Sequence, residues 1–137
     1  MIDFLRMRKL IRQVPKAAFA VEQAEARATC GAITYSDMPK AQGAGDKLER
    51  DVITVMELRA AYLEIVVELE RMKKELKPYI DDLANPEQKA VMRLRYLDGQ
   101  SPEVIANSSI VPMSRMTVYR ALRSGEDAIR QKLVLNI

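Results

Sequence analysis

The chain has 137 residues, almost half of them hydrophobic, with a net charge of +3, a single cysteine and no histidine. This length allows one domain or two small ones, and the hydrophobic content is enough for a packed core, which argues against wholesale disorder. Without histidine, the usual general bases, catalytic triads and zinc sites are missing. We therefore expect neither an enzyme, nor a cofactor, nor a metal site.

Residue usage favours an all-α protein, because aromatic residues are few and Ala, Leu, Met, Glu, Lys and Arg dominate. Cys30 has no partner within the chain, which fits a reducing compartment. The N-terminus does not resemble a signal peptide, since Arg6, Arg8 and Lys9 interrupt its apolar run, and no stretch approaches the length of a membrane span. These features predict a cytoplasmic protein that does not contact a membrane.

The first predicted element is a helix from Ile2 to about Ala28, interrupted at Pro15, which should kink or split it near Gln13. One apolar stripe at helical spacing consists of Phe4, Met7, Ile11, Val14, Ala18 and Val21. Basic residues crowd the same segment, namely Arg6, Arg8, Lys9, Arg12 and Lys16. The long middle helix, in contrast, is net acidic, and this charge asymmetry suggests that the two ends of the chain face a polyanion and the middle faces protein or water. The alternative, a helix lying on a membrane, fits less well because the stripe after Pro15 is rich in alanine.

A loop is predicted from Thr29 to Gly45, where glycines, a proline and small polar residues gather. Residues 46–77 then form the longest predicted helix, before Pro78 weakens or bends it. Eleven positions at intervals of four and three form a seam close to that of a coiled coil, and nine of them are apolar: Leu48, Val52, Val55, Arg59, Tyr62, Val66, Leu69, Lys73, Leu76, Ile80 and Leu83. A flanking row widens the stripe with Ile53, Met56, Ala60, Leu63 and Val67.

These two helices predict an N-terminal helical hairpin, or coiled coil, over residues 1–83. The flanking row is more apolar surface than one antiparallel partner needs, so we favour a homo-oligomer. The alternative is that both rows are buried within one chain.

Residues 84–137 predict a second domain of three short helices, because three helix starts occur within a short span. Asn85 precedes Pro86, Ser101 precedes Pro102, and Ser114 precedes the last helix. The last two helices form a helix-turn-helix, in which Val118, Ala121 and Leu122 should face the others. Despite Gly125, the apolar spacing continues to Leu133, so the last helix should extend past Arg123.

The exposed residues of the last helix are suited to DNA, because its first turns carry hydrogen-bond donors and no acidic residue. The predicted DNA-binding residues are Arg115, Thr117, Tyr119, Arg120 and Arg123. Arg115 and Thr117 lie at the N-terminal end, which reads base edges when a helix enters the major groove, and the other three would contact bases or phosphates. The simpler alternative is a purely structural unit, since surface helices often carry arginines. Ser101, Glu103 and Ser114 are better interpreted as caps or positioning residues, and Arg95 as a paired structural arginine.

A resemblance favours the DNA interpretation. The segments VMRLRYLDGQSPEVIA and SRMTVYRAL resemble the promoter-recognition region (region four) of bacterial sigma factors. The whole layout resembles small phage-encoded regulators of late genes, of the ArpU and RinA type. This resemblance implies sequence-specific binding of double-stranded DNA and control of phage transcription in the host cytoplasm. One departure is the turn from Asn107 to Met113, which is longer than in the family.

Two other functions stay open. The chain could be the DNA-recognition subunit of a phage packaging machine, or an adaptor that binds host RNA polymerase through its likeness to region four.

Overall fold

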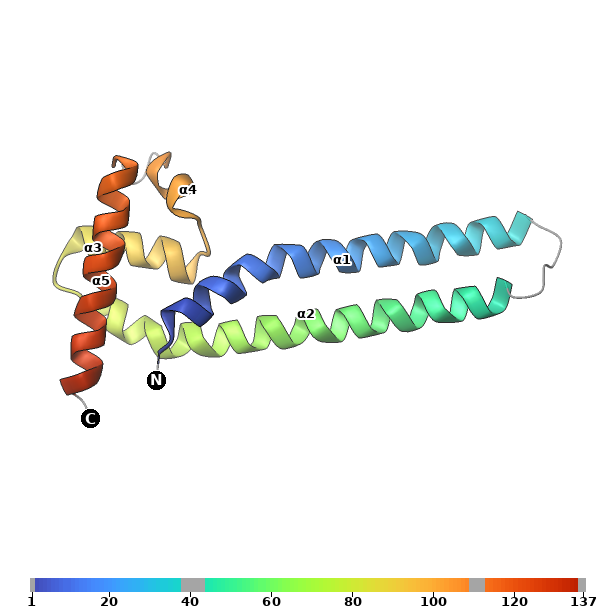
Figure 1. The fold of residues 1–137 in the computed structure, drawn as a ribbon, viewed down its shortest axis with the longest axis horizontal. Helices are drawn as coiled ribbons and strands as arrows, with labels where there is room; N and C mark the ends of the chain where they lie inside the picture. Colours follow the sequence, from blue (N-terminus) through green and yellow to red (C-terminus); the bar gives the residue numbers. More distant parts are fainter. Residues whose placement is uncertain (1, 38–43, 109–112, 136–137) are drawn as a thin grey trace. The chain divides into compact units, whose positions relative to one another are not determined.

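The computed structural model describes residues 2–37, 44–108 and 113–135, and among these the side chains of 2–29, 47–108 and 113–135. Every regular element in these ranges is a helix, which confirms the predicted all-α class. In chain order they are α1 (Phe4–Asp37), α2 (Ala44–Asp81), α3 (Pro86–Met92), the π-helical segment η1 (Arg93–Leu97), α4 (Pro102–Ala106) and α5 (Arg115–Leu135) (Figure 1).

The chain forms two compact units. The first, which we call the core unit, joins Met1–Ile11 to Leu69–Ile137, and the second, the hairpin unit, is Arg12–Glu68. Both long helices therefore contribute to both units. The predicted domain boundary lies between residues 83 and 84, whereas the core unit also takes in the start of α1 and the end of α2. The reason is hydrophobic burial, since three short helices alone offer little core.

Nearly all buried apolar side chains belong to the core unit. The first turns of α1 contribute Phe4, Met7 and Leu10, and the end of α2 contributes Leu69, Met72, Leu76 and Ile80. The remaining helices add Val91, Met92, Tyr96, Ile105, Val118, Ala121, Leu122 and Ile129, with Leu83 from the preceding turn. Within this set, Val118, Ala121 and Leu122 confirm the predicted buried face of α5. The core unit is thus held together by helices from both ends of the chain.

The predicted helix starts are confirmed at atomic detail. The Asn85 side-chain oxygen accepts hydrogen bonds from the backbone N–H groups of Glu87 and Gln88, at 2.9 and 3.3 Å. The Ser101 hydroxyl oxygen accepts from the Val104 N–H at 3.3 Å, and that of Ser114 accepts from the Thr117 N–H at 3.2 Å. Each cap satisfies donors that the first helical turn leaves without a partner. The longer turn before α5 includes residues 109–112, which lie outside the described residues.

The π-helical segment changes which residues the first short helix buries. The spacing of Val91, Leu94 and Leu97 predicted one apolar face, yet Leu94 and Leu97 are only half-buried. Val91 and Tyr96 are fully buried instead, together with Met92. A π-helix has more residues per turn than an α-helix, so the segment rotates Tyr96 onto the face that Val91 begins. It ends at Leu97, and the predicted stop at Asp98 and Gly99 follows directly, with a φ of 71° at Gly99 that favours glycine.

Proline and glycine interrupt the long helices less than predicted. Pro15 lies inside α1, which is not split, and Pro78 lies inside α2, which continues to Asp81. Because Ile80 is fully buried, its packing offsets the hydrogen bond that Pro78 cannot make. The predicted loop from Thr29 to Gly45 is also wrong at both ends, since α1 extends to Asp37 and α2 begins at Ala44. Adding a residue to an existing helix is easier than starting one, which lets α1 continue through this weak stretch.

The hairpin unit pairs the rest of α1 with the first two-thirds of α2, side by side (Figure 1). Among its described side chains, only the apolar residues Ala24 and Val55 are buried. An ion pair joins its helices, with the Arg59 Nη2 atom 2.6 Å from the Glu25 Oε1 atom. Within the described ranges, no helix combines the length and the apolar content that a membrane span requires.

Candidate nucleic-acid interface

The predicted DNA-binding residues lie on α5, and the fold decides which of them face outward. Val118, Ala121 and Leu122 turn one side of α5 into the core unit. Arg115, Tyr119, Arg120 and Arg123 are all exposed, and Thr117 is half-buried. Because residues three and four apart share a helix face, Arg115 and Tyr119 form one outer edge, and Arg120 and Arg123 lie on the outward side. The structure therefore places the predicted arginines on one exposed side of a helix whose other side is buried in the core unit.

Glu103 of α4 contacts both residues of this outer edge, Arg115 and Tyr119. Its carboxylate Oε1 atom lies 2.7 Å from the Arg115 Nη2 atom and accepts a hydrogen bond from it. The same oxygen accepts a hydrogen bond from the Tyr119 hydroxyl at 2.9 Å. These two contacts link the short helix α4 to the first two turns of α5. They also hold the Arg115 guanidinium in a defined position at the surface.

The electrostatics of this cluster follow from the same contacts. A hydrogen bond from its own backbone amide and those from Arg115 and Tyr119 lower the pKa of Glu103 from 4.5 to about 2. The hydrogen bonds to Glu103 and Tyr119 raise the pKa of Arg115 above its ordinary value. Both groups are therefore fully charged at neutral pH. Glu103 places a negative charge at the edge of an otherwise basic surface, a feature that a search for basic residues alone does not reveal.

The other predicted residues have different surroundings. The Thr117 hydroxyl lies 2.7 Å from the Ser114 hydroxyl, so it belongs to the local cap of α5. Arg120 makes a long contact, 3.5 Å, from its Nη2 atom to the Met116 sulfur. Arg123 forms no hydrogen bond or ion pair with the described part of the chain. Of the five residues, Arg120 and Arg123 would therefore break the fewest contacts within the chain on binding a ligand.

A buried polar cluster joins the middle of α5 to the first turns of α1. The Tyr96 hydroxyl donates a hydrogen bond to Glu126 Oε1, and the Arg8 Nη1 atom donates to the same carboxylate oxygen at 2.8 Å. Arg8 also donates to the Tyr96 oxygen at 3.1 Å. Burial, together with the charge and hydrogen bond of Glu126, raises the pKa of Tyr96, so its phenol remains a donor.

This cluster corrects one expectation from the sequence. Arg8 was grouped with the basic residues that face a polyanion, but its guanidinium is engaged by Glu126 inside the core unit. The prediction failed because Glu126 is more than a hundred residues away in the chain, so no local pattern links the two. Arg95, by contrast, was expected to be a paired structural arginine, and its Nη1 atom donates to the Gln100 carbonyl oxygen at 3.1 Å.

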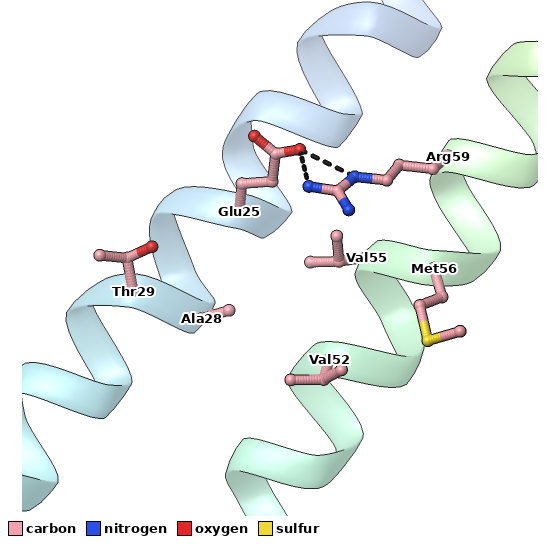
Figure 2. Close-up of a pocket in the computed structure, with 7 residues that line it drawn as sticks. All are labelled: Glu25, Ala28, Thr29, Val52, Val55, Met56 and Arg59. Carbon is pink, nitrogen blue, oxygen red and sulfur yellow. Dashed lines mark hydrogen bonds and ion pairs between the residues drawn. The ribbon is translucent and has the colours of Figure 1, made fainter.

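A second surface feature belongs to the hairpin unit, which contains none of the predicted site residues. An open groove between α1 and α2 is lined by Glu25, Ala28, Thr29, Val52, Val55, Met56 and Arg59 (Figure 2). Its walls are mostly apolar, apart from the ion pair of Glu25 with Arg59. The described side chains bring together no group of three or more Asp, Glu or Cys residues that could hold a metal ion.

Comparison with known proteins identifies the family. The profile of DUF1492, whose description is a protein of unknown function, matches residues 33–130, well over half of the chain. The chain belongs to the DUF1492 family. The match contains Glu103 and all five predicted DNA-binding residues, whereas Arg8 lies outside it. No curated protein and no solved structure matches the chain.

Proposed function

We propose that this DUF1492 protein is a sequence-specific DNA-binding regulator of transcription, and that it acts on phage late genes. The observation that carries the proposal is the exposed face of α5, where Arg115, Arg120 and Arg123 lie together on a helix with a capped start. Such a helix can enter a major groove and present its first turn to base edges. The resemblance to sigma region four and to the ArpU and RinA type of regulator supplies the link to phage transcription.

The arrangement assigns different roles to the arginines. Arg115 is held by Glu103, so little side-chain freedom is lost when it contacts a base. The neighbouring carboxylate would also repel a phosphate, which directs Arg115 to base edges. Arg120 and Arg123 have no acidic partner in the described part of the chain and suit phosphate contacts. Binding should therefore combine one specific contact with a salt-dependent contribution from the backbone.

The test is a titration against duplexes from the genome that encodes the chain, at two salt concentrations and with excess random competitor. We expect one promoter-proximal site to be retained under competition. Arg115→Ala should weaken binding to that site roughly ten- to a hundredfold and relax the preference at one base pair. Arg123→Ala should weaken binding to all sequences alike and reduce the salt dependence. Lys77→Ala, which removes an exposed cation of α2, is the matched control.

Binding that is weak and blind to sequence would contradict the regulator proposal. Equal loss on every sequence with Arg115→Ala would contradict the role given to Arg115.

One observation favours a second candidate, an adaptor for host RNA polymerase. Val104 and Met116 are exposed apolar side chains beside Glu103 and Arg115, and a mixed apolar and charged surface is typical of contacts between proteins. This candidate predicts a polymerase complex that survives when Arg115, Arg120 and Arg123 are all replaced by alanine.

A further inference from the structure

A row of apolar residues runs along one exposed face of α2 within the hairpin unit. Its members follow one another at intervals of three and four residues, and all are exposed: Ile53, Met56, Ala60, Leu63 and Val67. We call this set the α2 apolar row. Met56, Leu63 and Val67 each expose 60% or more of their surface. This spacing is the seam of a coiled coil, and a single chain leaves it uncovered.

The hairpin unit has little else to hold it together. Among its described side chains, only the apolar residues Ala24 and Val55 are buried, whereas the core unit buries all the others. Two helices gain most of their stability from packing an apolar face, because isolated helices are marginal in water. A contiguous apolar surface on a soluble protein also marks a site of association. The α2 apolar row is therefore the surface of this unit on which further packing would add most stability.

The residue types in the row indicate what that surface is. When Ile53, Ala60 and Val67 are assigned to heptad position a, Met56 and Leu63 occupy position d. Branched Ile and Val at a with Leu at d favour two parallel helices over higher oligomers. The row thus has the pattern that a helix uses to pair with an identical helix in the same direction.

Charges beside the row distinguish the two directions. In the same heptad assignment Arg59 occupies position g, and Glu57 and Glu64 occupy position e. A parallel pair sets each g residue against the e residue five positions later in the other helix, so Arg59 meets Glu64. An antiparallel pair centred on Ala60 would instead set Arg59 against Arg59, and Glu57 against Glu64. Only the parallel pair places opposite charges together.

Arg59 already forms an ion pair within its own chain and keeps donors for such a contact. Its Nε and Nη2 atoms donate to Glu25 Oε1 at 3.0 and 2.6 Å, as Figure 2 shows. A guanidinium has five N–H donors, so these bonds fix the side chain and leave donors for a second carboxylate. Arg59 remains 60% exposed at its side chain, which keeps it accessible.

We propose that a second copy of this chain packs against the α2 apolar row in a parallel, two-stranded arrangement, with Arg59 of each copy facing Glu64 of the other. The inference goes beyond the proposed function and does not depend on DNA. If the proposed function also holds, a symmetric dimer carries two identical copies of α5, so the DNA site should have two-fold symmetry.

The first test is sedimentation of the full chain without DNA, over a wide concentration range. We expect a dimer, and we expect Leu63→Glu to be a monomer at concentrations where the natural chain is dimeric. Phe19→Glu is the matched control, because Phe19 is equally exposed but lies on α1 of the same unit. It should remain dimeric. A monomeric natural chain, a dimeric Leu63→Glu variant or a monomeric Phe19→Glu variant would each overturn the inference.

Cross-linking tests the direction without disturbing the fold. In a background where Cys30 is replaced by serine, Ile53→Cys should form a disulfide-linked dimer on oxidation, because a parallel pair sets position 53 against itself. An antiparallel pair would set position 53 against position 67, so preferential cross-linking in a mixture of Ile53→Cys and Val67→Cys chains would refute the parallel arrangement. Glu64→Lys should raise the dimer dissociation constant roughly tenfold, with a smaller effect at high salt. An unchanged constant at low salt would contradict the pairing with Arg59.

Discussion

Replacing Arg8 tests how much the ion pair between Arg8 and Glu126 contributes to the packing of α5 in the core unit. In Arg8→Met the aliphatic length of the side chain is kept, but the Glu126 carboxylate, only 11% exposed, loses its closest cation at 2.8 Å. Removing one partner of a fully buried ion pair costs about 3–5 kcal/mol. Here the loss should be smaller, because Arg8 is 31% exposed, the Tyr96 hydroxyl still donates to Glu126, and Arg130 Nη2 lies 3.9 Å from its Oε2 atom. We expect the free energy of unfolding to fall by about 2–3 kcal/mol.

The assay is urea unfolding followed by far-UV circular dichroism at one fixed protein concentration, because association between copies adds to stability. A double-mutant cycle separates the ion pair from packing. Glu126→Met alone should cost about 1–2 kcal/mol, since it leaves Arg8 able to reach water and Tyr96 without its acceptor. The double variant should be within about 1 kcal/mol of Glu126→Met, because no buried charge is then left unpaired.

The matched control removes a cation from the same unit. Lys73 pairs with Glu70 at 3.3 Å, but the Glu70 side chain is 62% exposed, so Lys73→Met should change stability by no more than about 0.5 kcal/mol. An Arg8→Met variant as stable as the natural chain would refute this reasoning. So would a double variant whose loss of stability equals the sum of the losses in Arg8→Met and Glu126→Met, because the ion pair would then not stabilise the packing of α5.

Two further predictions concern α4 and α5. Because the folded-state pKa of Glu103 is lowered from 4.5 to about 2, its contribution to stability is present above pH 4.5 and is lost as the pH falls towards 2. A carboxyl-carbon NMR titration should find the Glu103 midpoint near 2, and a midpoint near 4.5 would show that Arg115 does not hold it. Gly125→Ala should lower stability by about 1–2 kcal/mol although alanine favours helices by about 1 kcal/mol, because the added Cβ would lie 2.7 Å from Cγ of the buried Met92 and overpacking costs about 1–3 kcal/mol. Ser124→Ala on the exposed side is the control for propensity, and a Gly125→Ala variant more stable than the natural chain would contradict the packing argument.

Much of the candidate interface was predictable from the sequence. Helix caps depend on residues two or three positions apart, so Asn85, Ser101 and Ser114 identified the starts of the short helices correctly. The exposed side of α5 followed from its apolar spacing, which placed Val118 and Leu122 inside. Arg115 and Arg123 were found in the same way. Their predicted contacts with DNA remain predictions, because they concern a partner molecule.

What the sequence could not determine depends on contacts between distant residues. Glu103 is predicted to be a cap or positioning residue, and its ion pair with Arg115 depends on α4 packing against α5. Gly125 looked like a weak point in a helix, whereas the structure shows that Met92 of α3 occupies the space beside it. In both cases the role of the residue is set by a neighbour from another helix.

By itself, the sequence determined that the chain is all-helical, where the C-terminal helices start, which side of α5 is exposed, and that α2 carries two apolar rows. These are properties of local spacing and propensity, which act over a few residues. Only the tertiary structure decided that the first turns of α1 join the core unit, that Arg8 forms an ion pair with Glu126, and which apolar row of α2 is left exposed. Those outcomes depend on hydrophobic burial and ion pairing between segments far apart in the chain, and no local pattern encodes them.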